Sequence, residues 1–222
     1  MNGIIIIDKP LGRTSHDMVY VMRKMTGIKK VGHTGTLDPE ATGVLPVCIG
    51  SATKVADMLT LSDKCYRAEL VLGMTTDTQD ADGEVLTECE VTCSEDEIRQ
   101  VIMSFVGEIE QIPPMYSAIK QNGKKLYELA RKGIEVERKS RKVTINSIDI
   151  LEINGERVTI DVSCSKGTYI RTLCEDIGMK LHVGAYMNTL RRTKTGPFTI
   201  EESHTLKEIE TLKNNGELEK II

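Results

Sequence analysis

Hydrophobic and polar residues alternate or cluster along several short stretches of the chain, and these stretches predict β-strands. Over residues 66–72, apolar side chains occupy every second position, with Arg67 and Glu69 between them. This alternation is typical of a strand that buries one face and exposes the other. The apolar runs from Gly3 to Asp8 and from Val44 to Ile49 contain few polar residues and predict buried strands.

A turn signal joins two further strand-like segments. The stretches from Val143 to Ile153 and from Arg157 to Cys164 flank the dipeptide Asn154-Gly155. Asn-Gly readily adopts the positive φ angles that a two-residue hairpin turn requires. Together these features predict an antiparallel hairpin.

Helical spacing of apolar residues, with capping residues at the ends, predicts the helices. Ser94 and Glu97 form a capping box before an apolar face that includes Ile98 and Val101, and Gly107 is a stop signal. The other predicted helices span Ser15 to Gly27 with Ser15 as the cap, Ala52 to Leu61, Lys124 to Lys132, Thr168 or Tyr169 to Leu181, and Thr205 to Leu212.

The order of these elements favours the α+β class. Strands and helices alternate irregularly and a hairpin is present, which indicates a mixed, mostly antiparallel central sheet flanked by helices. No repeat, low-complexity tract or Pro/Ser-rich linker divides the 222 residues, so we expect a single domain over residues 1–222. The sequence has neither a GxGxxG motif after a strand nor a P-loop lysine motif. This argues against enzymes that bind nucleotide cofactors through those motifs.

Composition limits the compartment and the bound groups. No apolar run reaches the length of a membrane span, and the run from Ile4 to Ile7 has no basic flank or cleavage signature. The six cysteines contain no CxxC pair, and the four histidines are scattered. We therefore expect no membrane association, no metal site, and reduced thiols in a cytoplasmic protein.

Charge is distributed unevenly, although the net charge is −4 at pH 7. The segment from Thr75 to Glu110 holds eleven acids and one Arg, whereas the segment from Ala118 to Lys142 holds nine Lys or Arg and three Glu. Such a protein can bind a phosphate backbone with one face while remaining acidic overall. The alternative is that both runs are solvated faces without a ligand.

One loop carries the strongest candidate for chemistry. Residues 32–39 read GHTGTLDP and lead into the strand-like run ATGVLP at residues 41–46. Glycine turns on one side and Pro39 on the other can hold the carboxylate of Asp38 at one place and angle. Asp38 is therefore a candidate nucleophile, and the alternative is an Asp-Pro turn without a catalytic role.

Two further segments offer unusual side chains. Tyr66, within Lys64-Cys65-Tyr66-Arg67, is either a stacking platform for a base or a filler of the core. Residues 112–120 read IPPMYSAIK and precede Tyr127 and Arg131. The two prolines enforce an extended backbone, which gives a rigid edge with a basic helix behind it.

A strand-to-helix turn provides another candidate segment, with the sequence CSKGTYIRTL at residues 164–173. Backbone N–H groups at such a turn favour anions. Arg171 could pair with Asp38 and keep it ionised, or it could only cover the helix end or bind a surface acid. The downstream Leu190-Arg191-Arg192 is either part of the same site or a strand end with two solvated charges.

In their order and spacing, these segments resemble the TruB family of pseudouridine synthases, from Asp8-Lys9-Pro10 to Leu190-Arg191-Arg192. The resemblance implies the pseudouridine synthase fold with a catalytic cleft, and conversion of a uridine in tRNA to pseudouridine. It implies that Asp38 is the nucleophile, that Arg171 pairs with it, and that Tyr169 contributes to catalysis. The expected substrate contacts are His33, Tyr66, Tyr169 and Leu190, and the expected RNA contacts are Lys9, Lys120, Lys124, Arg131, Arg191 and Arg192.

The implied reaction makes demands that the sequence can meet. It breaks the N1–C1′ bond and forms a C5–C1′ bond without a redox partner or energy source, and we expect no cofactor. The target nucleotide must leave its stack, which costs a few kcal/mol in round terms. One carboxylate can stabilise charge at C1′. Whether Asp38 adds to C1′ or assists proton loss at C2′, giving a glycal, stays open, as does assistance by Tyr169 in the later proton loss at C5.

The expected function is the isomerisation of uridine 55 by a monomer that binds the T-arm of tRNA. One alternative is a synthase for another RNA, including a guide-directed one, and a second is a non-catalytic module that binds or folds tRNA. A glycoside hydrolase would need a second carboxylate, and nothing in the sequence sets Glu175 or Asp176 opposite Asp38. Bacterial members of the family usually carry a C-terminal RNA-binding domain of the PUA type, and we expect none within this chain.

Overall fold

The chain divides into two compact units, each with its own core. The computed structural model describes residues 1–121 and 123–222. Unit 1 comprises Met1–Arg67 and Leu190–Ile222, and unit 2 comprises Ala68–Thr189. The expectation of one domain over the whole chain stays a prediction.

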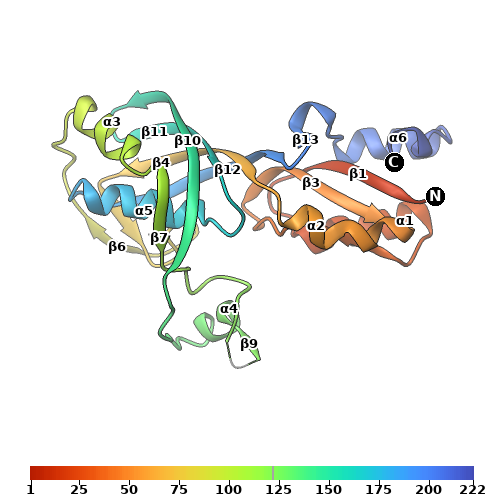
Figure 1. Ribbon diagram of the computed structural model, residues 1–222, viewed down its shortest axis with the longest axis horizontal. Helices are drawn as coiled ribbons and strands as arrows, with labels where there is room; N and C mark the ends of the chain where they lie inside the picture. Colours follow the sequence, from red (N-terminus) through yellow and green to blue (C-terminus); the bar gives the residue numbers. More distant parts are fainter. Residues whose placement is uncertain (122) are drawn as a thin grey trace. The chain divides into compact units, whose positions relative to one another are not determined.

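Unit 1 is built around a buried strand, β3 (Ala41–Ile49) (Figure 1). The strands β1 (Gly3–Lys9) and β2 (Val31–His33) pair with β3 in the antiparallel direction. The last part of β12 (Ala185–Thr195) pairs with β3 in parallel, with Leu190 opposite Ala41. These pairs confirm both predicted buried strands and the predicted mixed, mostly antiparallel sheet.

Gly43 lets β3 and β12 approach closely. Its φ angle is +101°, in a region that other residues rarely adopt. A Cβ atom at this position would lie 2.2 Å from the carbonyl oxygen of Arg192. Any side chain here would therefore push the two strands apart.

The cap of the helix α1 (Ser15–Thr26) is Thr14, one residue before the predicted cap. The hydroxyl group of Thr14 accepts a hydrogen bond from the N–H of Asp17 at 3.1 Å. The prediction of Ser15 as the cap is wrong, because Ser15 is buried and its hydroxyl group binds another segment. The predicted stop at Gly27 is confirmed, since this residue adopts the left-handed C-cap with φ of 72°.

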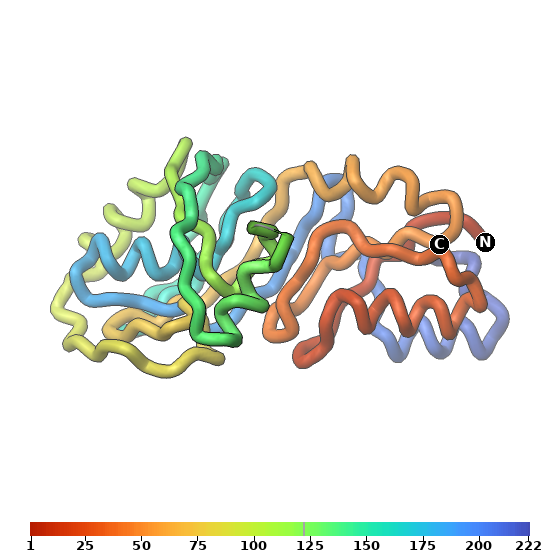
Figure 2. Tube along the Cα trace, turned by 90° about the horizontal axis from the view of Figure 1, so that it is seen from below, coloured from red at the N-terminus to blue at the C-terminus, as the bar shows by residue number. Residues whose placement is uncertain are grey.

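The two ends of the chain meet within unit 1. A Cβ atom on Gly3 would lie 2.8 Å from Ile222, and the termini lie side by side (Figure 2). The predicted helix near the C-terminus is confirmed as α6 (Leu206–Asn214), capped by Thr205. The remaining elements are η1 (Gly50–Val55) and α2 (Ala56–Thr60), which replace one predicted helix, and β13 (Phe198–Thr199), η2 (Ile200–Glu202) and η3 (Leu218–Ile221).

Unit 2 contains most of β4 (Lys64–Leu72), followed in the sheet by β11, β10 and β7. The strands β10 (Arg141–Asn154) and β11 (Arg157–Cys164) form the predicted hairpin, paired in the antiparallel direction. The strand β7 (Gly107–Gln111) pairs with the other edge of β10. The sequence did not predict β7, nor the small sheet of β5 (Met74–Thr76) and β6 (Val85–Glu88).

The two longer helices described in unit 2 are α3 (Glu95–Met103) and α5 (Ile170–Lys180). The helix α3 has the predicted capping box of Ser94 and Glu97. The helix α5 starts after Tyr169, as predicted. Among the described residues, no helix combines the length and the apolar character that crossing a membrane demands.

Residues 112–140 connect β7 to β10, and we call this segment the basic insertion. Figure 1 shows it extending from the ends of these two strands. It holds β8 (Lys120–Gln121), β9 (Lys124–Lys125) and α4 (Leu126–Ala130). The helix is shorter than predicted because its first two predicted residues pair with β8 instead.

A half-buried acid on α5, Asp176, makes the stability of unit 2 depend on pH. The pKa of Asp176 is raised from 3.8 to about 6, mainly because burial disfavours the charged form and also because Glu175 lies nearby. The folded-state pKa thus lies above the unfolded value. The stabilising contribution of this carboxyl group is complete below about pH 4 and is lost as the pH rises through about 6.

We expect Asp176→Asn to raise the free energy of unfolding at pH 8 by about 1–3 kcal/mol, because asparagine has no charge to bury. At about pH 3 we expect little difference, since the wild-type group is then mostly protonated in both states. Urea denaturation at both pH values measures the effect, with the exposed Asp149→Asn as the control. Equal stability of wild type and Asp176→Asn at pH 8 would contradict this account.

Candidate active site

The loop that carries Asp38 is pinned to α1 by one buried hydroxyl group. Ser15 Oγ accepts a hydrogen bond from the N–H of Leu37 at 2.8 Å and donates one to its carbonyl oxygen at 3.0 Å. Leu37 is buried, whereas Asp38 is exposed. The N–H of Ala41 then donates to the carbonyl oxygen of Asp38 at 3.1 Å, which closes the turn. The backbone on both sides of Asp38 is therefore fixed, while Asp38 itself is exposed.

Lys9 supports this loop from inside unit 1. Its side chain is fully buried, and its Nζ donates to the carbonyl oxygens of Pro10, Arg13 and Pro39 at 2.9, 2.6 and 3.1 Å. Burial lowers the pKa of Lys9 to about 8, although Glu40 and Asp38 oppose the shift. The ammonium group therefore remains charged at neutral pH. This burial argues against the expected phosphate contact, because all three N–H groups already have acceptors.

Arg192 holds the other side of the loop. It is 1% exposed, its Nε donates to the carbonyl oxygen of Val44 at 2.8 Å, and its Nη2 donates to that of Gly35 at 3.2 Å. As for Lys9, burial argues against the expected RNA contact. Arg191 points elsewhere and pairs with Asp8 at 2.8 Å, while remaining partly exposed.

Other expected substrate contacts also lie in unit 1. His33 ends β2, and burial together with the charge of Arg192 lowers its pKa, so the imidazole is neutral at pH 7. Leu190 lies opposite Ala41 in the parallel strand pair, and Ala41 follows Asp38 by three residues in the sequence. Tyr66 is 9% exposed on β4. Four of the expected catalytic and substrate-contact residues thus belong to unit 1, namely Asp38, His33, Tyr66 and Leu190.

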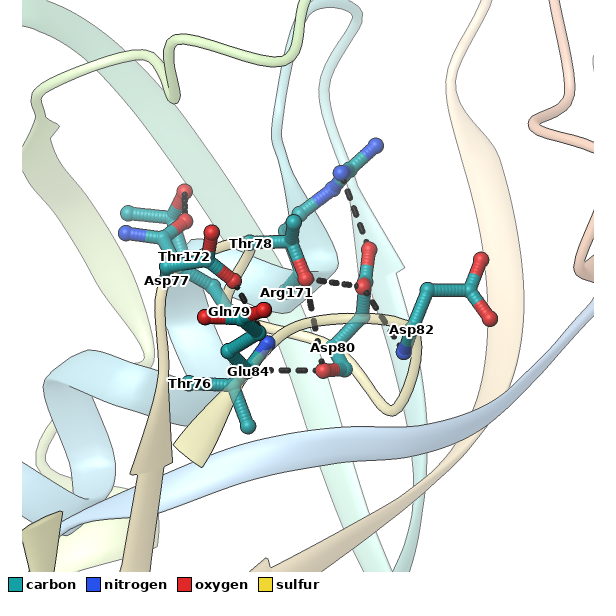
Figure 3. A network of polar contacts seen from close by, with 9 residues as sticks. All are labelled: Thr76, Asp77, Thr78, Gln79, Asp80, Asp82, Glu84, Arg171 and Thr172. Carbon is teal, nitrogen blue, oxygen red and sulfur yellow. Dashed lines mark hydrogen bonds and ion pairs between the residues drawn. The ribbon is translucent and has the colours of Figure 1, made fainter. Parts of the chain in front are cut away.

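Arg171 is anchored in unit 2 by an acid that the sequence did not single out. Arg171 is 6% exposed, and its Nη1 donates to Asp80 Oδ2 at 2.9 Å (Figure 3). The other carboxylate oxygen of Asp80 accepts from Thr78 Oγ1 at 2.5 Å and from the N–H of Asp82 at 3.3 Å. The carboxylate is therefore oriented by its own loop before it meets the guanidinium group.

Gln79 ties the same loop to α5. Its side-chain carbonyl accepts from Thr172 Oγ1 at 2.8 Å, and its amide nitrogen donates to Glu175 (Figure 3 shows the first contact). Gln79 has a φ angle of 66°, which is uncommon for a residue other than glycine. Two consecutive residues, Gln79 and Asp80, thus bind three side chains of one helix, including Arg171.

Tyr169 is held by its backbone and its ring. Gln111 Oε1 accepts from the N–H of Tyr169 at 3.0 Å, and Gln111 Nε2 donates to its carbonyl oxygen at 3.1 Å. The guanidinium carbon of Arg141 lies 4.8 Å from the centre of the Tyr169 ring. Because Gln111 occupies the N–H of Tyr169, this amide does not serve the anion site expected at the turn.

The basic insertion exposes three of the expected RNA contacts, Lys120, Lys124 and Arg131. It also borders a cavity of about 550 Å³. The cavity is lined by Pro113, Ile119, Lys120, Gln121, Leu126, Glu137, Arg138, Lys139, Ser140 and Arg141. Cations outnumber acids in this lining, which favours an anionic ligand.

Asp38, Tyr66, His33 and Leu190 lie in unit 1, whereas Tyr169 and Arg171 lie in unit 2. The pairing of Arg171 with Asp38 stays a prediction. Sequence reasoning missed Ser15, Asp80 and Gln111 as supports of the site. The acidic segment around Asp80 contributed only its net charge to the sequence analysis. Its sequence TDTQDADG at residues 76–83 is rich in Asp and Thr, whose side chains can bond to nearby backbone groups, and this indicates a turn.

The comparisons with known proteins agree with one another. The family described as "TruB family pseudouridylate synthase (N terminal domain)" matches residues 23–170, and "tRNA pseudouridylate synthase B C-terminal domain" matches residues 171–222. A tRNA pseudouridine synthase B of Alkaliphilus oremlandii is 59% identical over 214 residues, covering 96% of this chain and 72% of the relative. One of Dechloromonas aromatica is 50% identical over 222 residues, covering 100% of this chain and 74% of the relative.

Two solved structures have a similar fold over almost the whole of this chain. A chain in "Crystal Structure of a Cbf5-Nop10-Gar1 Complex" is 37% identical with a TM-score of 0.75, covering 96% of this chain and 56% of that chain. A chain in "Structure of H/ACA RNP bound to a substrate RNA containing 2'-deoxyuridine" is 33% identical with a TM-score of 0.74, covering 99% of this chain and 58% of that chain. This chain therefore spans less than two thirds of those solved chains. The residue pattern, the fold and the extent of these matches lead to one conclusion: the chain belongs to the TruB family of pseudouridylate synthases.

Proposed function

We propose that this protein isomerises the uridine at position 55 in the T-loop of tRNA, with Asp38 as the nucleophile and without a cofactor. Membership of the family supports the coarser statement that it is a tRNA uridine isomerase. One observation carries the proposed nucleophile. Asp38 is exposed on a loop whose backbone is fixed by three buried side chains: Ser15, Lys9 and Arg192.

This arrangement suits a carboxylate that must meet a sugar carbon. Lys9 and Arg192 donate hydrogen bonds to backbone carbonyl groups, so these two side chains hold the loop through its backbone. A nucleophile that is fixed before the substrate arrives loses little entropy in the reaction. Its negative charge can stabilise the positive charge that develops at C1′ when the N1–C1′ bond breaks.

The atoms of the reaction balance within the nucleoside. The N1–C1′ bond breaks and a C5–C1′ bond forms, while the proton on C5 is lost to a base and N1 gains a proton from solvent. Asp38 either adds to C1′ and is later displaced, or removes a proton from C2′ to give a glycal and returns a proton to C2′ when the C5–C1′ bond forms. In the proposal Tyr169 assists the loss of the C5 proton, and Arg171 supplies positive charge to the carboxylate.

The remaining side chains have supporting roles in the proposal. The target nucleotide leaves the stack, and Tyr66 and Leu190 retain its base, while neutral His33 supports the RNA where the nucleotide leaves. The exposed cations of the basic insertion bind phosphates of the T-arm, and the protein acts as a monomer. Arg191 is part of this RNA surface, since it remains partly exposed beside Asp8.

Mapping pseudouridine on a treated transcript tests the whole proposal. Carbodiimide labelling followed by primer extension should give one new stop, at uridine 55, on an unmodified tRNA transcript incubated with the protein. A stop at another uridine would leave the isomerase intact and refute the position. A stop only in another class of RNA would refute tRNA as the substrate, and no stop in any RNA would refute the proposed activity.

The basic insertion provides a second, independent test. We expect each of Lys120→Gln, Lys124→Gln and Arg131→Gln to weaken tRNA binding and to reduce the slope of log K against log salt by about one. Each lost phosphate contact releases about one counterion fewer, which is the physical reason. Filter binding over a salt series measures the slope, with the exposed Lys207→Gln of α6 as the control. An unchanged slope in all three variants would remove the insertion from the RNA surface.

A further inference from the structure

Two side chains that face each other across a strand pair both reach Tyr169. Gln111 is the last residue of β7, Arg141 is the first of β10, and they lie directly opposite in the antiparallel register. Opposed residues of an antiparallel pair project on the same face of the sheet. Here both side chains meet the turn at residues 167–169 that precedes α5.

Gln111 fixes the backbone of Tyr169. It is 1% exposed, and its amide group makes two hydrogen bonds with the N–H and the carbonyl oxygen of Tyr169, at 3.0 and 3.1 Å. The same carbonyl oxygen accepts from the N–H of Leu173 at 3.1 Å, which is the first helical bond of α5. Tyr169 is thereby held at φ of −99° and ψ of 112°, outside the helix that it begins.

Arg141 fixes the ring of the same residue. Its Nη2 donates to the carbonyl oxygen of Gly167, which orients the guanidinium group, and the group lies over the ring of Tyr169 with 4.8 Å between Cζ and the ring centre. A guanidinium group at this distance is attracted to the face of the ring. Backbone and ring are thus constrained from two directions by two neighbouring side chains.

We propose that Gln111 and Arg141 are positioning residues that set the direction of the Tyr169 phenol for the isomerisation. The inference rests on the proposed function, because it takes the role of Tyr169 from there. The basic insertion leaves the sheet after Gln111 and returns at Arg141. A displacement of the two ends of the basic insertion therefore acts on Tyr169 through the side chains of Gln111 and Arg141. RNA binding by the insertion and the placement of the phenol thus depend on the same two residues.

The direction of the ring can be observed without RNA. We would label the full chain with 3-fluorotyrosine and assign the ¹⁹F resonance of Tyr169 by its loss in Tyr169→Phe, among the six tyrosines. Gln111→Leu, which removes both hydrogen bonds, and Arg141→Met, which removes the cation over the ring, should each shift or broaden this resonance. The surface variants Gln100→Leu and Arg99→Met of α3 should leave it unchanged.

Kinetics separates positioning from a merely structural role. With tRNA as substrate, Gln111→Leu and Arg141→Met should lower kcat by about 10- to 100-fold and leave KM within about threefold, because a misdirected group affects the chemical step and not RNA binding. Arg141→Lys keeps the charge and loses the planar fork, so it should recover part of kcat. If Gln111→Leu does not fold, Gln111→Glu keeps the acceptor for the N–H and replaces the donor, and the same losses apply.

An unmoved Tyr169 resonance in the folded variants, or a moved resonance with a wild-type kcat, would overturn the proposal. If the wild-type protein makes no pseudouridine in any RNA, the proposed function fails. The ¹⁹F measurement then still decides whether Gln111 and Arg141 control the ring, so the two failures are distinguishable.

Discussion

Asp38→Asn should release no tritium above background from tRNA that carries 5-tritiated uridine, while binding that tRNA with unchanged affinity. Asparagine has nearly the shape of aspartate, and the loop is fixed by contacts to the backbone of residues 35, 37 and 39, so the fold should persist. The amide lacks the negative charge that the reaction needs at the sugar. We expect a loss of about 10³-fold or more in kcat.

The neighbouring carboxylate of Glu40 provides a matched control. It is exposed and lies two residues after Asp38 in the same turn. Glu40→Gln removes the same charge from the same loop and should retain most of the tritium release. If Asp38→Asn releases tritium at a rate near wild type, Asp38 is not the nucleophile. If both variants are inactive, the charge of the loop and not the identity of one carboxylate determines the rate.

Elements with local signals could be predicted from the sequence, and elements defined by distant partners could not. The hairpin signal at Asn154-Gly155 and the capping box of Ser94 depend on residues within a few positions, and both the hairpin and the capping box are confirmed, although the two turn residues are Gly155 and Glu156. The strand β7 reads GEIEQ and is defined by its pairing with β10, where the side chain of Glu108 also accepts a hydrogen bond from Lys142. A short polar strand of this kind has no signature of its own.

The same distinction explains what the sequence could not reveal about the site. The glycine and proline residues around Asp38 indicate a rigid loop, and the structure agrees for its backbone. Lys9 and Arg192 were expected to contact RNA on the resemblance to the family, and both are buried. Among their acceptors are the carbonyl groups of Pro39, about 30 residues from Lys9, and of Val44, about 150 residues from Arg192, and no local pattern encodes such a separation.

Substitution of Asp80 should also lower the rate strongly, because Asp80 forms an ion pair with the nearly buried Arg171. Asparagine at position 80 lacks the negative charge that pairs with Arg171 Nη1 at 2.9 Å, so the guanidinium group loses an ion pair that orients it. We expect Asp80→Asn to lower kcat by about 10²-fold with little change in the Kd for tRNA. Glu84→Gln, which removes an exposed acid from the same hairpin, should remain close to wild type.

A double-mutant cycle decides whether Asp80 acts through Arg171. If Asp80 serves only to direct this guanidinium group, then Asp80→Asn combined with Arg171→Lys should cost no more than the worse single variant, because both remove one function. Additive losses would mean that Asp80 has a separate role in the reaction. A wild-type kcat for Asp80→Asn would show that the charge of Asp80 is not needed to direct Arg171. The contacts of Gln79 with Thr172 and Glu175 of α5 would then be sufficient to hold this part of unit 2.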